Sequence, residues 1–220
     1  MSTNAKIATV FTVVLVLGLV AALAIAIASR TPPETPAQNP ETSLPATLRD
    51  DTHILDEGPA DIVLVEFLDF ECEACGAFYP YVEELRTEFA GEVTFAFRYF
   101  PLPGHGNSVN AAVAVEAASR QGQLEPMYAR LFESQAEWGE KGSESQAPLF
   151  REFAQELGLD MAQFDADVAD PAVLERVQSD FNDGLGLGVE STPTFFLNDR
   201  KVELTSFEDL RAAIEAELAR

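Results

Sequence analysis

Two cysteines stand three positions apart and are the only cysteines in the 220 residues of the chain. They are Cys72 and Cys75, and a helical pattern follows them. Unpaired backbone N–H groups and the positive end of the helix dipole would favour the thiolate of Cys72 and make it a nucleophile. Cys75, one turn further on, could attack a mixed disulfide on Cys72 and release the partner. The spacing therefore predicts a redox-active pair of thiols.

Two other uses of the cysteines compete with this prediction. A structural disulfide needs no activated thiol, and it stays open as an alternative. A four-cysteine zinc site is excluded by the count of cysteines, and the addition of His53 and His105 gives a spacing that fits no common zinc pattern. We therefore expect redox chemistry without a metal or another cofactor.

A carboxylate precedes the first cysteine by six positions. Glu66 lies inside the apolar run 63–68, whose β-branched and aromatic residues predict a buried strand. Burial would raise the pKa of Glu66, so that this side chain could accept the proton that Cys75 must lose. If the strand lay at the edge of the sheet, the carboxylate would instead face water.

Two prolines occupy positions that bear on the same site. Pro80 falls inside the helical pattern of 79–89, where it would kink the helix. Thr192-Pro193 opens the apolar run 194–197, and a proline suits the start of a strand. The bond before Pro193 could be cis, although only about 5% of bonds before proline are.

The carboxylate, the cysteine pair and the two prolines together resemble the thioredoxin superfamily. Residues 98–105, with the sequence Arg-Tyr-Phe-Pro-Leu-Pro-Gly-His, are followed by Asn107 and an alanine-rich helix, and they resemble its DsbA-like branch of thiol:disulfide oxidoreductases. The resemblance covers about residues 51–220. It implies an α/β thioredoxin fold with an inserted helical subdomain at about 105–188, which in this family forms a lid near the active site.

The resemblance also implies roles for residues far from the cysteines. Pro193 would be the cis-proline of the family beside the cysteines, and the Thr192 backbone would pair with a bound substrate as a short added strand. His105 could contact the substrate groove, or it could be a capping or structural histidine. Family members often have proline after this histidine, where this chain has Gly106, so the resemblance is looser there.

The chain differs from strongly oxidising relatives in the residues beside Cys72. Those relatives have a histidine between the cysteines, whereas this chain has Glu73-Ala74, with Glu71 on the other side of Cys72. Two exposed carboxylates would disfavour a further negative charge and weaken the thiolate. We therefore expect an oxidant milder than the strongest family members.

An uncharged stretch of 22 residues, 7–28, lies near the N-terminus. As a helix it would span about 33 Å, enough for the hydrocarbon core of a bilayer. It is longer than the ~7–15 apolar residues of a signal peptide, although 26–28 could serve as a cleavage site. We expect a transmembrane anchor, with residues 1–6 in the cytoplasm and a proline-rich linker over 29–50.

Residues 51–220 are enough for one domain with a sizeable core. Apolar periodicity predicts its elements. The expected strands are 53–55, 63–68, 93–99, 194–197 and 201–204, and the expected helices are 79–89, 109–120, 124–135, 148–157, 161–168, 172–185 and 206–218. We expect strand 93–99 to be half-buried, Ser108 and Ser206 to cap helices, and 198–200 to form a hairpin turn.

The net charge of −23 argues against partners that are themselves anionic, such as nucleic acid and acidic lipid head groups. The acidic residues are spread along the domain, which is typical of a solvated surface. Trp138, the only tryptophan, could bind a partner or pack a loop against the domain. His53 is expected to be structural.

Together these features predict an extracytoplasmic thiol:disulfide oxidoreductase with a single-pass anchor in the cell membrane. Outside the cytoplasm, paired cysteines can persist oxidised. The enzyme would form disulfide bonds in reduced exported proteins through Cys72 and Cys75, and the resemblance implies re-oxidation by a quinone-linked membrane partner. A disulfide reductase or isomerase at the same site, and a membrane-tethered binding or chaperone module with a structural disulfide, are the alternatives.

Overall fold

The structure of the chain is a computed structural model that describes residues 46–58, 61–139, 142 and 144–220. The expected anchor at 7–28, the residues 1–6 before it and most of the linker at 29–50 lie outside the described residues. No helix within the described ranges has both the length and the apolar composition that crossing a bilayer requires.

Two parallel strands form the centre of the sheet and lead to the predicted site. β2 (Val63–Leu68) pairs with β3 (Thr94–Tyr99), and Val63 lies opposite Thr94. Every residue of both strands is buried. The prediction of a half-buried strand over 93–99 is therefore wrong, because helices cover both faces of the sheet at β3.

Antiparallel strands extend the sheet on either side of this pair. β1 (His53–Asp56) lies against β3, while β4 (Thr194–Leu197) lies against β2 and carries β5 (Arg200–Lys201) at the edge. The order within the described residues is β1-β3-β2-β4-β5. The last strand is shorter than the pattern over 201–204 predicted.

The turn between β4 and β5 also holds the segment at Ala46 and Thr47. Asn198 and Asp199 both have positive φ, which short polar side chains tolerate in a tight hairpin. The Asp199 carboxylate accepts hydrogen bonds from the backbone N–H groups of Ala46 and Thr47 at 2.8 and 2.9 Å. Thr47 is buried, so the packed domain begins before Asp51, within the range predicted as linker.

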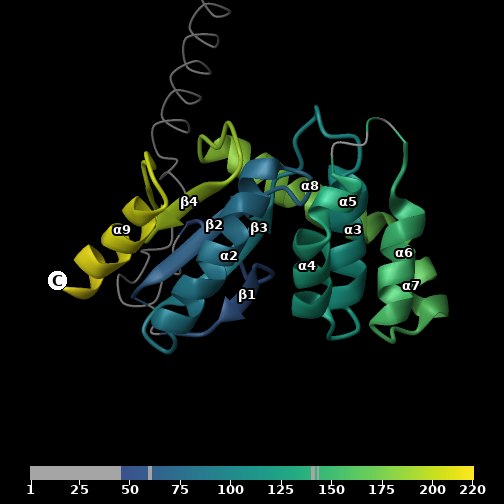
Figure 1. Cartoon of the computed structure of the whole chain (residues 1–220), viewed down its shortest axis with the longest axis horizontal. Coiled ribbons are helices and arrows are strands. Elements are labelled where there is room, and N and C mark those ends of the chain that lie inside the picture. The colour runs from purple at the N-terminus through teal and green to yellow at the C-terminus, as the bar shows by residue number, and fades with distance from the viewer. Residues whose placement is uncertain (1–45, 59–60, 140–141, 143) are drawn as a thin grey trace, which may run out of the picture. The chain divides into compact units, whose positions relative to one another are not determined.

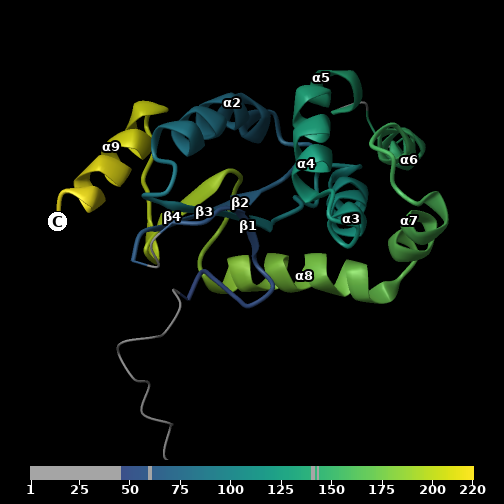
Figure 2. The same cartoon turned by 90° about the horizontal axis from the view of Figure 1, so that it is seen from below.

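Helices cover both faces of the sheet. In chain order they are α2 (Glu73–Glu88), α3 (Ser108–Ser119), α4 (Leu124–Glu133), α5 (Gln135–Trp138), α6 (Ala147–Glu156), α7 (Met161–Val168), α8 (Pro171–Gly186) and α9 (Glu208–Leu218). α2 and α9 lie on one face, and α8 runs along the other (Figure 1, Figure 2). Alternation along β2 places Leu64 and Leu68 in the core under α2, and Val65 and Phe67 in the core under α8.

The segment between β3 and β4 is helical from α3 to α8, which confirms the predicted insertion at about 105–188. α3 to α7 gather beside the sheet (Figure 2). The four-residue α5 was not predicted. Within it Trp138 is fully buried, packs edge-on against Phe150, and donates its Nε1–H to the Leu131 carbonyl at 3.1 Å. Trp138 therefore packs the subdomain, and the alternative of a partner-binding aromatic is wrong.

Two predicted helix caps differ in the structure. The residue before α3 is Asn107, and the hydroxyl of Ser108 donates to Asp69 instead of capping the helix. The residue before α9 is Phe207, and the Asp209 carboxylate accepts the N–H of Ser206 at 2.8 Å. That N–H precedes the helix, and the residue before α9 makes no side-chain cap hydrogen bond; Glu208 and Asp209 in the first turn instead place negative charge at the positive end of the helix dipole.

Candidate active site

Cys72 lies in the turn from β2 into α2, directly before the first helical residue. Its N–H donates to the Asp69 carbonyl at 3.1 Å, and its carbonyl accepts the Gly76 N–H at 3.0 Å. Both cysteines are free thiols; Cys72 is 8% exposed and Cys75 is fully buried. A reactant can therefore reach the first sulfur and not the second.

The pKa of Cys72 is lowered to about 5. The largest cause is a hydrogen bond from the Cys75 thiol; burial opposes it, and hydrogen bonding at Thr192 and at the backbone of Cys75 and Ala74 adds to the lowering. At neutral pH Cys72 is therefore a thiolate, as predicted for a cysteine at the start of a helix.

The pKa values of Cys75 and Glu66 are raised, in contrast to that of Cys72. Burial, followed by Cys72 and Glu66, raises the pKa of Cys75 well above its ordinary value. Glu66 is 6% exposed, and burial followed by the charges of Cys72 and Glu83 raises its pKa to about 8. The predicted burial of Glu66 is confirmed, and the alternative of an edge carboxylate is wrong because β2 lies between β3 and β4.

Thr192 and Pro193, directly before β4, lie beside the thiolate. The bond between Thr192 and Pro193 is cis, which confirms that expectation. The Cys72 sulfur lies 3.4 Å from the Thr192 carbonyl, to which it can donate only while it is protonated. A chain bound over Cys72 would therefore meet the backbone of Thr192 beside the reacting sulfur.

A buried carboxylate organises the turn before Cys72. Asp69 accepts hydrogen bonds from the backbone N–H groups of Glu71 and Leu102, from the Ser108 hydroxyl, and from the Nδ1–H of His105 at 2.6 Å. Three of these donors follow β3 or begin α3. The Asp69 side chain thus joins the turn that carries Cys72 to the beginning of the helical subdomain.

The two glutamates beside Cys72 do not act as expected. Glu71 is buried rather than exposed, and its Oε2 accepts the Asn107 N–H at 2.6 Å. Glu73 is exposed, where solvent and salt screen its charge. Neither carboxylate is among the principal influences on the pKa of Cys72. The expectation of a milder oxidant therefore loses the support that it drew from a weakened thiolate.

One further residue of the site could not be predicted from a sequence pattern. Gln135, at the start of α5, donates from Nε2 to the carbonyls of Phe70 and Cys72, both at 2.8 Å. A Cβ on Gly76 would lie 2.1 Å from the Gln135 Oε1, so an alanine here would force the Gln135 side chain to shift. Gln135 lies 63 positions after Cys72, and no local pattern links residues at that separation.

The structure brings together most of the predicted site residues. Cys72, Cys75, Glu66 and Thr192 influence one another through the contacts and charges above, and Pro193 follows Thr192 directly before β4. His105 joins them only through Asp69. A hollow of about 390 Å³ is lined by the two neighbours of Cys72 in the chain, Glu71 and Glu73, and by Gln135, Ala136 and Gly139.

This fold and site define a thioredoxin-like protein with a helical insertion. Residues 49–216 match the family described as Thioredoxin, and the chain belongs to that family. Curated relatives include a Na(+)/H(+) antiporter NhaA 1 of Mycobacterium sp., 38% identical over 154 residues, and one of Salinispora arenicola, 35% identical over 173 residues. These matches cover 68% and 77% of this chain but 24% and 25% of the relatives, so the chain spans about a quarter of their length.

Solved structures share the architecture. A thioredoxin-like oxidoreductase from Silicibacter pomeroyi has a TM-score of 0.65 and 26% identity, covering 80% of this chain and 96% of that one. Oxidised BdbD from Bacillus subtilis has a TM-score of 0.66 and 21% identity, covering 77% and 94%. Alpha-DsbA1 from Wolbachia pipientis has a TM-score of 0.66 and 19% identity, covering 78% and 93%. The fold is thus that of DsbA-like thioredoxins.

Proposed function

We propose that this protein is a thiol:disulfide oxidoreductase that forms disulfide bonds in exported proteins by exchange through Cys72 and Cys75. The observation that carries the proposal is the contrast between the two thiols. The reachable one has a pKa of about 5, and the buried one has a pKa well above its ordinary value. An inert structural bridge requires no such contrast, whereas directional exchange depends on it.

In the oxidising direction, a substrate thiolate attacks the Cys72 sulfur of the disulfide and Cys75 leaves. Cys75 holds its proton strongly, so the neutral Glu66 carboxyl can supply one to it. A second substrate thiolate then attacks the substrate sulfur of the mixed disulfide, and Cys72 leaves as a stable thiolate. The substrate loses two electrons and gains a disulfide, while the enzyme gains those electrons as a dithiol.

The same groups support the reverse direction, and this makes a reductase or isomerase the second candidate. The Cys72 thiolate would attack a substrate disulfide, and Cys75 would then attack Cys72 and release the substrate as a thiol. Glu66, with a pKa of about 8, suits the removal of the Cys75 proton in that step. The direction inside cells depends on the redox partner.

We propose further that residues 7–28 anchor the protein in the cell membrane, with the domain outside the cytoplasm. The 22 uncharged residues of that stretch support an anchor, and the cysteine pair suits an oxidising compartment. Reduced exported proteins would bind over Thr192, Pro193 and His105, and a quinone-linked membrane protein would re-oxidise the thiols. We do not extend antiport to this chain, which matches only about a quarter of the antiporters.

Substitution of each cysteine tests the exchange. We expect Cys72→Ser to abolish oxidation of a reduced model protein, because the nucleophile is lost. We expect Cys75→Ser to accumulate mixed disulfides, because the internal thiol that releases a trapped partner is missing. Non-reducing electrophoresis of the full chain in cells measures the mixed disulfides, and Cys72→Ser/Cys75→Ser is the control that should trap none. Full activity of Cys75→Ser without trapping would contradict the assigned roles.

The redox state of the two thiols in cells tests the direction and the compartment. Acid quenching followed by alkylation separates disulfide from dithiol. A predominantly oxidised pair supports the oxidase, and a predominantly reduced pair supports the reductase.

A further inference from the structure

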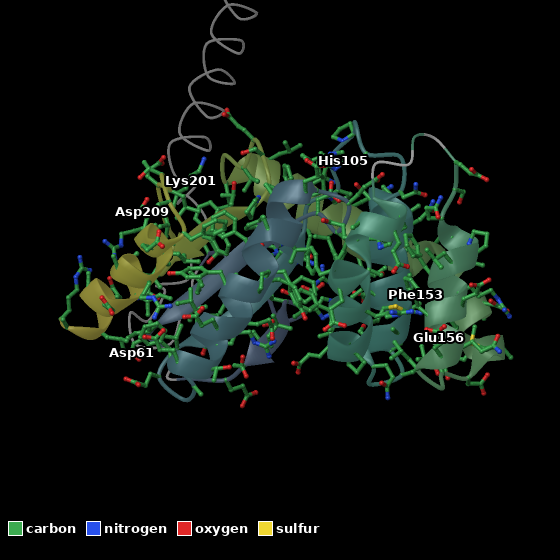
Figure 3. All side chains as sticks on the ribbon, in the orientation of Figure 1. Asp61, His105, Phe153, Glu156, Lys201 and Asp209 are labelled. Carbon is green, nitrogen blue, oxygen red and sulfur yellow. The ribbon has the colours of Figure 1, made fainter. Side chains whose placement is uncertain are left out.

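His105 is fixed on the loop between β3 and α3 by hydrogen bonds on two sides. Its backbone N–H donates to the Leu102 carbonyl at 3.0 Å, and its ring Nδ1–H donates to Asp69 at 2.6 Å. The ring is about one-fifth exposed, while the Asp69 side chain is fully buried. Figure 3 shows His105 on this loop, beside the helical subdomain. The ring is therefore held in place and still open to solvent protons.

The residue that holds the ring also holds the reactive cysteine. Asp69 accepts the Cys72 N–H with its backbone carbonyl and the His105 ring with its carboxylate. The position of the imidazole relative to the turn before α2 is thus set by one buried side chain. The dipeptide between the cysteines, Glu73-Ala74, supplies no positive charge.

Charges around His105 favour its protonated form. Burial of the ring opposes the charge, but the hydrogen bond and charge of Asp69, followed by the charges of Cys72 and Glu71, raise the pKa of His105. The facing residues at the start of α3, Asn107 and Ser108, are neutral. Because coupling between two sites is reciprocal, a thiolate that favours the imidazolium is itself favoured by it. The hydrogen bonds of Cys75 and Thr192 lower the pKa of Cys72 most, so an effect of the histidine would be smaller than theirs.

We propose that His105, held by Asp69, is a positioning residue whose positive charge stabilises the Cys72 thiolate and makes the pair a stronger oxidant when the histidine is protonated. The inference rests on the proposed exchange reaction and adds its dependence on pH. Stabilising the thiolate stabilises the reduced form, which makes the disulfide more oxidising. His105 is still protonated at its ordinary pKa of 6.5, because its pKa in the folded protein is higher. It loses the charge as the pH rises through that raised pKa, so its stabilisation of the thiolate disappears in alkaline solution.

The test uses redox equilibrium with glutathione on the full chain at about pH 6 and about pH 9. His105→Asn keeps a donor for Asp69 and removes the charge, whereas His105→Lys keeps a charge at both pH values. We expect His105→Asn to be about threefold less oxidising than wild type near pH 6 and equal to it near pH 9, while His105→Lys stays close to the wild-type value of pH 6 at both.

The other histidine of the chain provides a matched control. His53 is hydrogen-bonded to Glu116 at 2.7 Å and to Tyr99 at 3.0 Å, whereas His105 is hydrogen-bonded to Asp69 in the turn before Cys72. We expect His53→Asn to leave the glutathione equilibrium unchanged. Thiolate absorbance gives a second readout, in which His105→Asn should raise the pKa of Cys72 and His53→Asn should not.

Three results would overturn the inference in different ways. Equal equilibria for wild type and His105→Asn at both pH values would show that the charge does not act on the thiolate. A loss of the same size at both pH values, without rescue by His105→Lys, would show a purely structural role. A wild-type protein that does not exchange with glutathione at all would overturn the proposed function itself.

Discussion

At the scale of single residues, the site separates two thiols of the same type by their surroundings. Hydrogen bonds, including those from backbone N–H groups of the helix, lower the pKa of Cys72. Burial and the neighbouring Cys72 and Glu66 raise the pKa of Cys75. Glu66 shares the buried side of the site, and its pKa of about 8 places its proton exchange close to neutral pH. The buried Glu66 carboxyl therefore destabilises the fold near neutral pH, and it places a proton donor and acceptor beside Cys75.

Substitution of Glu66 should separate that cost from its use. We expect Glu66→Gln to slow exchange by at least about tenfold, because Cys75 loses its proton relay. We also expect it to stabilise the fold near neutral pH by about 3 kcal/mol, with little change near pH 4. The sign follows from the raised pKa: as the pH rises from 4.5 toward about 8, the unfolded chain ionises and the folded chain does not. Denaturation of both proteins across this range measures the difference.

Glu84→Gln is the matched control for this prediction. Glu84 lies on α2 with its side chain mostly exposed and paired to Arg211. The same chemical change there should alter stability by less than about 1 kcal/mol at any pH. A pH-independent effect of Glu66→Gln would contradict the assignment of a raised pKa.

At the scale of elements, α5 and the first turn of α2 meet through one amide. Gln135 donates to two carbonyls of the turn before α2, and Gly76 leaves the space that its side chain occupies. We expect Gly76→Ala to destabilise the wild-type fold, because the added Cβ collides with Gln135. In a Gln135→Ala background the same change should be stabilising by about 1 kcal/mol, since alanine is the better helix former. Denaturant midpoints of the four proteins give this double-mutant cycle.

The reversal of sign is the diagnostic result, and it requires no absolute value. Gly91→Ala is a useful comparison, because Gly91 has open space around its Cβ position but a positive φ. Its substitution should be destabilising with or without Gln135. A Gly76→Ala effect that is the same in both backgrounds would contradict the contact.

Several elements and part of the site could be predicted from sequence for physical reasons. β2, the cysteine turn and α2 follow from local apolar patterns, and the burial of Glu66 follows from its place in an apolar run. The cis bond at Pro193 was expected from a resemblance and not from local chemistry. The burial of Glu71 and the role of Gln135 depend on partners from the insertion, and residues far apart in sequence leave no periodic signal.

At the scale of the whole domain, a network of ion pairs joins Arg49 to the sheet and to α8. Arg98 on β3 and Arg176 on α8 both pair with Asp180, at 2.6 and 2.5 Å, and the side chains of Arg98 and Asp180 are fully buried. Arg98 also reaches Asp183, which accepts from Arg49 at 2.8 Å. The network thus links segments that are distant in the chain.

Removal of the central carboxylate should be costly. We expect Asp180→Asn to lower the free energy of unfolding by about 3–5 kcal/mol, because it leaves the charges of Arg98 and Arg176 without their shared partner. Asp165→Asn removes a partner from the exposed pair with Arg151 and should cost less than about 1 kcal/mol. Chemical denaturation measures both, and equal losses would contradict the importance of burial.

Every residue from Asp69 to Cys72 is hydrogen-bonded to the insertion. Asp69 bonds to His105 and Ser108, and Glu71 bonds to Asn107. The carbonyls of Phe70 and Cys72 both accept from Gln135. The core fold and its insertion are therefore not independent modules in this protein. Exchanging the cysteine motif between relatives would transplant a sequence without the scaffold that shapes its reactivity. Natural variation in the tetrapeptide before α2 is then expected to accompany variation some 35 to 65 positions downstream, as one inherited trait.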